Sequence, residues 1–262
     1  MSTNLFRQSR LALAMFALGV PAAAAPASAI SCAEAPVRLL RDTSLYAAAR
    51  GARVHSGDII ETGAGPIQLE GMGGATVAVG PASRLYFKLG DSVELTLLAG
   101  WIKVQAGPAG AVINAGPLRV NPDGSALIIH ASAGKTALFV ETGAPSVAEM
   151  QGAKQLRSTR LAREQYAVRT LKEPLKVLPR PPKDFLSAMP PAFFDPLVGV
   201  SFKGAAPALK LERAAVFASD VAPMLADEPA VFQILNRRFN PPPKRGIASA
   251  PGKPAPRDTP IY

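Results

Sequence analysis

The stretch "HSGDIIETGAGPIQL", residues 55–69, contains the pattern that decides the fold class. Its apolar pair Ile59-Ile60 follows Gly57-Asp58, and a second apolar segment, Ile67–Leu69, follows the glycines and proline of residues 63–66. Glycine tolerates positive φ and an aspartate side chain can bond nearby backbone, so both groups are typical of turns. The stretch therefore predicts two short strands joined by turns.

The same stretch contains His55, Asp58 and Glu61, which could also belong to a metal or acid–base site. A calcium loop that began at Asp58 would need oxygen ligands at alternate positions and a closing glutamate at the twelfth. The chain instead has Ile60 and Leu69 at two of these positions. We therefore expect Asp58 to stabilise a turn with its side chain, and we expect no metal site here.

The strand pattern continues on both sides of this stretch. Leu85 and Phe87 alternate with polar neighbours, as expected for a strand with one buried face. The spacing of about nine residues between strands is typical of all-β domains. The fold class predicted is mainly β, with short antiparallel strands in a sandwich or a β-roll or solenoid-like domain. The expected strand centres are Ile59, Gln68, Val77, Tyr86, Leu95 and Lys103.

The all-β domain is predicted to span residues 37–180. Inside it, "LRVNPDGSALII", residues 118–129, predicts a hairpin, because Pro122-Asp123-Gly124 is a favoured turn sequence. Its flanks, Leu118–Val120 and Ala126–Ile129, are then expected to pair with each other. The prolines after residue 178 end the domain, because proline supplies no ladder donor.

A different pattern follows. Residues 181–239 predict a small α/β extension with one short helix over 221–225 and a second that begins after Asp227. The second helix should pack on the β domain through an apolar face. Residues 240–262 are rich in proline and basic residues and predict a disordered tail that folding does not need. The apolar face of the second predicted helix comprises Val231, Ile234, Leu235 and Phe239.

Residues 1–29 are typical of a secretory signal peptide. Arg7 and Arg10 precede the apolar run Leu11–Val20, and Ala27-Ser28-Ala29 is a small-x-small cleavage site. The run is too short to cross a membrane as a helix, and no later stretch is apolar enough to do so. We expect a periplasmic product that begins after residue 29. Lipidation of Cys32 is the less favoured alternative.

Charge limits the partners. The chain has 29 basic and 19 acidic residues, a formal net charge of +10. Such a surface attracts anionic envelope polymers, lipid headgroups or acidic proteins. Nucleic acid is not expected, because the basic residues are scattered, without a recognition helix or an aromatic stacking strand. Cys32 is the only cysteine, so no intramolecular disulfide can form, and the oligomeric state stays open.

No catalytic or cofactor-binding residues can be named. His55 and His130 are the only histidines and lie far apart in the chain. The segment "ASAGKT", residues 131–136, lacks the first glycine of a phosphate-binding loop and leads into a predicted strand. A nucleophile-elbow motif is also missing. We therefore expect no catalytic, cofactor or metal site and a protein that is not an enzyme.

The strand motifs resemble the extracytoplasmic domain of the FecR-like family, over about residues 37–148. The resemblance implies a β-rich sensory or interaction module in the periplasm. Signal transducers of that family also have a cytoplasmic sigma-regulating domain and a membrane span, which this sequence does not show. The motifs are "GDIIETG" at residues 57–63, "IQL" at 67–69, "GGATVAV" at 73–79, "SRL" at 83–85 and "LAGWIKV" at 98–104.

The function predicted is that of a non-enzymatic periplasmic binding or assembly module of the bacterial envelope. The alternative is an accessory sensor that signals through a separate membrane partner. A less favoured alternative is an enzyme of envelope polysaccharide or peptidoglycan, for which no convergent catalytic set is visible. The ligand and any link to iron uptake stay open.

Overall fold

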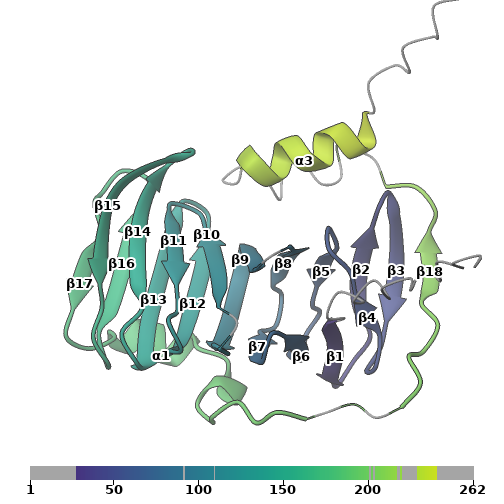
Figure 1. Ribbon diagram of the computed structural model, residues 1–262, viewed down its shortest axis with the longest axis horizontal. Coiled ribbons are helices and arrows are strands. Elements are labelled where there is room, and N and C mark those ends of the chain that lie inside the picture. Colours follow the sequence, from purple (N-terminus) through teal and green to yellow (C-terminus); the bar gives the residue numbers. More distant parts are fainter. Residues whose placement is uncertain are drawn as a thin grey trace, which may run out of the picture.

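The computed structural model describes residues 28–90, 92–108, 110–200, 202, 204–216, 219 and 229–240. This part of the chain is mainly β, as predicted (Figure 1). None of its helices is long and apolar enough to cross a membrane. The strands are β1 (Ser28–Ala33), β2 (Val37–Arg41), β3 (Ser44–Ala48), β4 (Arg53–Val54), β5 (Ile59–Glu61), β6 (Ile67–Met72), β7 (Ala75–Val79), β8 (Arg84–Leu89), β9 (Val93–Gln105), β10 (Ala111–Ala115), β11 (Leu118–Asn121), β12 (Ala126–Ser132), β13 (Lys135–Thr142), β14 (Ser146–Gln151), β15 (Lys154–Arg160), β16 (Tyr166–Thr170), β17 (Lys176–Leu178) and β18 (Lys210–Arg213). The helices are α1 (Lys183–Ala188), the 3-10 turn η1 (Pro191–Phe193) and α3 (Pro229–Phe239).

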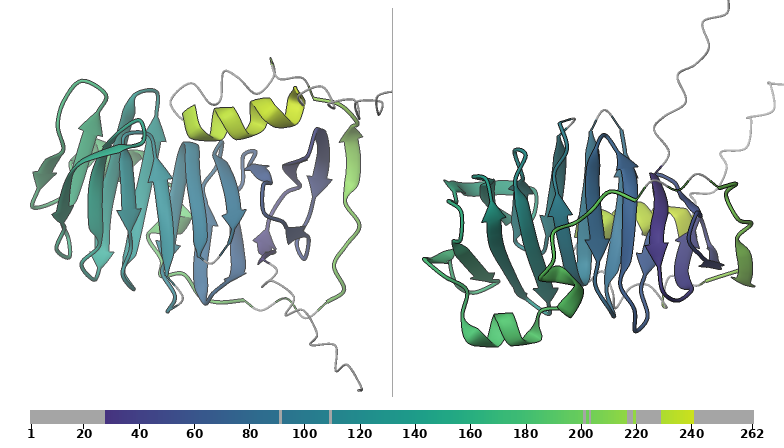
Figure 2. Two further views of the ribbon diagram at one scale, coloured as in Figure 1. Left: turned by 45° about the horizontal axis from the view of Figure 1, so that its top comes forward. Right: turned by 90° about the horizontal axis from the view of Figure 1, so that it is seen from below.

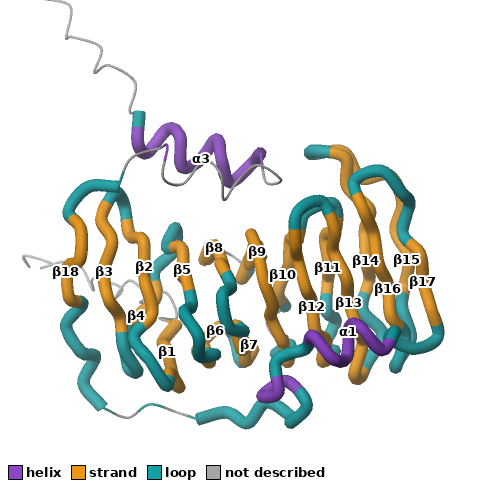
Figure 3. Tube along the Cα trace, turned by 180° about the vertical axis from the view of Figure 1, so that it is seen from behind, coloured by secondary structure: helices purple, strands orange, loops and turns teal. Residues whose placement is uncertain are grey.

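The strands form two layers that face each other across one apolar core. In the first layer the pairing order is β4, β1, β6, β7, the second half of β9, β12, β13, β16 and β17. In the second layer it is β18, β3, β2, β5, β8, the first half of β9, β10, β11, β14 and β15. The chain moves back and forth between the layers while it advances along the molecule (Figures 1 and 3). This is the roll-like arrangement expected from the sequence.

Strand β9 joins the two layers. The expected strands around Leu95 and Lys103 are therefore one long strand, and the prediction of two strands was wrong. Its first half pairs with β8 and β10, and its second half pairs with β7 and β12. The chain bends between the halves at Gly100, where φ is +88° and a Cβ would lie 2.2 Å from the Ser83 hydroxyl. Only glycine satisfies both conditions without strain.

The expected hairpin over residues 118–129 does not form. Strand β11 pairs with β10 and β14 in the second layer, whereas β12 pairs with β9 and β13 in the first. The turn itself is present, with the Ser125 amide bonded to the Pro122 carbonyl at 2.8 Å and positive φ at Asp123 and Gly124. It carries the chain from one layer to the other. Turn residues thus marked the reversal but could not determine which strands pair.

The core between the layers is built from the inward residues of both. Leu85 and Phe87 of β8 belong to this core, and so do Leu127 and Ile129 of β12 in the other layer. The outward residue between each pair, Tyr86 or Ile128, belongs to a separate apolar cluster. Alternate residues of these strands therefore belong to apolar clusters on opposite faces of the layer.

The segments after β17 cover these outer faces (Figure 2). Helix α1 and η1 pack on the first layer through Phe185 and Phe193. Strand β18 extends the second layer by pairing with β3. Helix α3 packs on the outer face of the second layer through Val231 and Leu235. The segment expected as an α/β extension thus lies against both layers.

Several predicted features fall at the edges of the described chain. Strand β1 begins at Ser28, inside the expected cleavage site, and Ser28 and Ala29 pair with Val54 and Arg53. The rest of the expected signal peptide, the helix over 221–225 and all of the expected tail except Asn240 lie outside the described residues.

Candidate functional site: a groove on the second layer

In the stretch at residues 55–69, the side chain of Asp58 stabilises the local fold. The Asp58 carboxylate is buried and accepts hydrogen bonds from Arg41 Nε at 3.0 Å, from Arg41 Nη2 at 2.7 Å and from the His55 amide at 2.7 Å. The hydrogen bond to Asp58 raises the pKa of Arg41 above its usual value. The turn bond of Asp58 was predicted from the sequence. Its ion pair with Arg41 was not, because it depends on the pairing of β2 with β5.

The two histidines lie in different places. His55 is exposed, whereas His130 stacks on Trp101 with ring centroids 4.1 Å apart. Burial, with a smaller contribution from Lys135, lowers the pKa of His130. Trp101 also packs against Phe185 of α1. His130 is therefore part of the aromatic contact that attaches α1 to the first layer.

Two basic residues, Lys103 and Arg169, are buried. Lys103 Nζ lies beneath η1 and donates at 2.8 Å each to Glu141 Oε1 and to the carbonyls of Phe193 and Asp195. All three of its donor positions are satisfied. Arg169 is the second such residue. Both act on the fold and contribute little to a charged surface.

Arg169 reaches from β16 across the core to Glu149 of β14. Glu149 accepts from Arg169 Nε at 3.0 Å, from Arg157 Nε at 3.0 Å and from the Leu175 amide at 3.0 Å. Burial alone would raise the pKa of Glu149, but these hydrogen bonds outweigh it and hold the pKa below its usual value. Glu149, Arg157 and Arg169 thus form a charged cluster at the end of the apolar core, near the last strands of the two layers.

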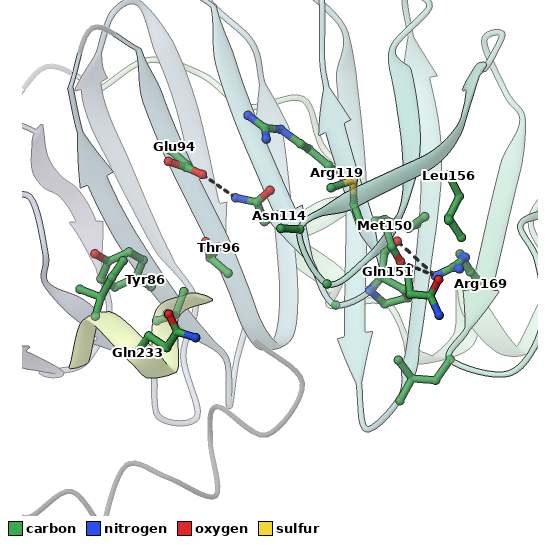
Figure 4. A pocket seen from close by; sticks show the side chains of 18 of the residues that line it. Tyr86, Glu94, Thr96, Asn114, Arg119, Met150, Gln151, Leu156, Arg169 and Gln233 are labelled. Carbon is green, nitrogen blue, oxygen red and sulfur yellow. Dashed lines mark hydrogen bonds between the residues drawn. The ribbon is translucent and has the colours of Figure 1, made fainter. Parts of the chain in front are cut away.

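A groove lies beside this cluster, on the outer face of the second layer (Figure 4). Strands β8 to β11 form its floor, α3 forms one wall, and the β14–β15 turn with residues after it forms the other. Its volume is about 880 Å³, within the range of sites that hold a small ligand or a short chain segment. The lining residues are Tyr86, Lys88, Glu94, Thr96, Asn114, Gly116, Pro117, Leu118, Arg119, Met150, Gln151, Gly152, Ala153, Leu156, Arg169, Leu171, Val231, Gln233 and Ile234.

The floor of the groove is polar. Glu94 is held by Lys88 Nζ at 2.8 Å and by Asn114 Nδ2 at 2.9 Å, and the hydrogen bond from Lys88 is the main cause of its lowered pKa. Arg119, on β11 opposite Asn114, is exposed. Its side chain makes no hydrogen bond or ion pair with another residue that the structure describes, although its charge adds to the lowering of the pKa of Glu94. Burial raises the pKa of Tyr86, which also lines the floor. Arg119 is thus the cation in the floor that is available to a ligand.

The walls are apolar. Leu156 is 49% exposed, Leu171 61% and Ile234 42%, and all three line this groove. Ile234 was expected to pack on the β domain with Val231 and Leu235, but it faces the groove. These exposed apolar side chains gather around one depression of the surface.

The described lining residues of the groove include one carboxylate, Glu94, which is paired with Lys88, and no histidine, cysteine or serine. Within the described part of the chain, no three His, Cys, Asp or Glu side chains are grouped so that they could hold a metal ion.

The sequence did not predict this groove. Arg119 and the exposed residues of α3 are far apart in the chain, and the layer order brings them together. Of the mostly exposed strand β15, only Leu156 lines the groove.

No family model matches the sequence, and no curated protein matches it. Two crystal structures of a putative anti-sigma factor from Parabacteroides distasonis ATCC 8503, at 1.65 and 2.50 Å resolution, are similar to this chain. Each shows 14% sequence identity and a TM-score of 0.41, over 47% of this chain and 59% of that chain. The likeness to a FecR-like domain stays a prediction from the sequence motifs.

Proposed function

We propose that this protein is a non-enzymatic binding or assembly module of the bacterial envelope that holds a protein partner in the groove between α3 and the β14–β15 turn. The groove carries this proposal, because it combines an available cation, a polar floor and exposed apolar walls. Pockets of this kind, with apolar walls and a few placed polar groups, are the usual form of a binding site.

The scaffold supports the same function. The floor strands belong to one continuous layer, and Lys88, Glu94 and Asn114 hold one another in place. A rigid floor lowers the cost of ordering side chains when a partner binds. The wall formed by α3 is fastened to the β domain by Arg238 Nη1, which donates to the Gly57 carbonyl at 3.0 Å.

The experiment is site-specific photocrosslinking in the cells that make the protein. A benzophenone amino acid replaces Leu156 in the groove or, as the matched control, Val198, which is 69% exposed and lies outside the groove. We expect a discrete adduct with one protein from position 156 and none from position 198. Equal adducts at both positions, or none at either, would overturn the proposed function.

The envelope location is part of the proposal and rests on the N-terminal sequence. N-terminal sequencing of the exported product should begin at Ile30. A product that retains Met1, or one with a lipidated Cys32, would contradict this part of the proposal without affecting the groove.

A further inference from the structure

The charge of the groove restricts what it can hold. Of its four charged lining residues, Lys88 and Glu94 neutralise each other and Arg169 is bonded to Glu149. Arg119 therefore leaves the floor with a net positive charge. The exposed guanidinium of Arg119 is best matched by a carboxylate or a phosphate, which can accept two of its hydrogen bonds.

The walls restrict the occupant further. Leu156, Leu171 and Ile234 gain from contact with apolar groups, because such contact removes their exposed surface from water. An anionic polysaccharide has carboxylates but few alkyl groups. A peptide segment with acidic residues between apolar ones matches both the floor and the walls.

Charge also excludes two other occupants. The C-terminal residues 241–262 contain Lys244, Arg245, Lys253 and Arg257 against a single acid, Asp258. A second copy of the chain carries a formal net charge of +10. Both have the same sign as Arg119, so neither is favoured at this site.

We propose that the groove binds a segment of an acidic partner protein, with a carboxylate of the segment on Arg119 and its apolar side chains against Leu156, Leu171 and Ile234. This inference rests on the proposed function and adds the chemical class of the partner. It assigns Arg119 as the residue that selects for acidic segments.

The test measures binding of a fluorescent ten-residue peptide of alternating Glu and Leu to the purified protein by anisotropy. Parallel probes replace Glu by Gln, or Leu by Ser, and polygalacturonate serves as an anionic polysaccharide. Arg119→Gln should weaken binding of the Glu–Leu peptide by about three- to fivefold, the upper part of the range expected for an ion pair of an exposed side chain.

The matched control is Arg53→Gln. Arg53 is an exposed residue of β4 in the other layer, so this variant changes the net charge equally and leaves the groove intact. We expect it to change the affinity by less than about twofold, as for a distant surface charge. Leu171→Ser should lower the affinity for the Glu–Leu peptide by at least about threefold, whereas Val198→Ser should not, because only Leu171 lies in the groove.

Three results would overturn the inference: equal weakening by Arg119→Gln and Arg53→Gln, tighter binding of polygalacturonate than of the peptide, or no binding of any probe. Each leaves the proposed function standing if position 156 still crosslinks a partner in cells. Loss of that crosslink would overturn the proposed function itself, so the two failures can be told apart.

Discussion

Replacing Asp58 by alanine removes the group on which the turn between β4 and β5 depends. The carboxylate accepts two hydrogen bonds from Arg41 and one from the His55 amide. In the variant the His55 amide loses this acceptor. Arg41 keeps its bond to the Arg53 carbonyl at 2.9 Å but loses its counterion.

The expected loss follows from how far the pair is buried. The side chain of Asp58 is 2% exposed and that of Arg41 is 21% exposed. Removing one partner of a fully buried pair costs about 3–5 kcal/mol, because the other charge is left uncompensated. Partial hydration of Arg41 reduces this, so Asp58→Ala should lower the free energy of unfolding by about 2–4 kcal/mol. That exceeds the ~1 kcal/mol expected for a turn bond alone.

Urea unfolding followed by fluorescence measures this loss, because Trp101 is the single tryptophan and is buried against His130 and Phe185. The control is Arg163→Ala, which breaks the exposed pair Arg163–Glu164 and should change stability by less than about 1 kcal/mol. The double variant with Arg41→Met should show a coupling of at least about 1 kcal/mol. A loss below about 1 kcal/mol for Asp58→Ala, or additive effects of the two changes, would refute the reasoning.

Three further predictions concern the buried ionisable groups. Glu149→Gln should destabilise the protein by about 3 kcal/mol at neutral pH, because Arg169 loses its counterion. The difference in stability from wild type should shrink in acid, because the pKa of Glu149 is lowered in the folded protein. The stability that the ionised Glu149 contributes is present above its unfolded-state pKa and is lost as the pH falls through its folded-state pKa. Urea titrations at several pH values measure this difference. His130→Gln should flatten the fall in stability between about pH 7 and 5, because the lowered pKa of His130 makes its protonation oppose folding; an unchanged slope would contradict this. Lys103→Met should cost about 1–3 kcal/mol and speed amide hydrogen exchange near Phe193, while unchanged exchange would mean that Lys103 does not fasten η1.

Local chemistry accounts for the features that the sequence predicted well. Alternation in segments such as "RLYFK", residues 84–88, needs only the period of two of a strand, so the mainly β class could be recognised. The turn role of Asp58 depends on His55, three positions away, and was equally accessible. These interactions join residues that are neighbours in the chain.

Pairing between distant segments was not accessible. The turn at Pro122–Gly124 looks the same whether its flanks form a hairpin or enter different layers, and only the ladders of β9, β10, β13 and β14 decide between them. The bend at Gly100 is similar, because its close contact with Ser83 exists only once β8 and β9 are paired.

The sequence by itself determined the mainly β class, the inward-facing residues of strands such as β8 and the position of turns such as the one at Asp58, because these depend on side-chain size, polarity and backbone freedom within a few residues. The tertiary structure alone decided that Lys103 and Arg169 are buried while Arg119 is exposed in the floor of a groove. It also decided that Leu156, Leu171 and Ile234 line one groove. The physical reason is that the burial and pairing of a charge depend on which distant segments pack over it, and the local sequence pattern does not specify those segments.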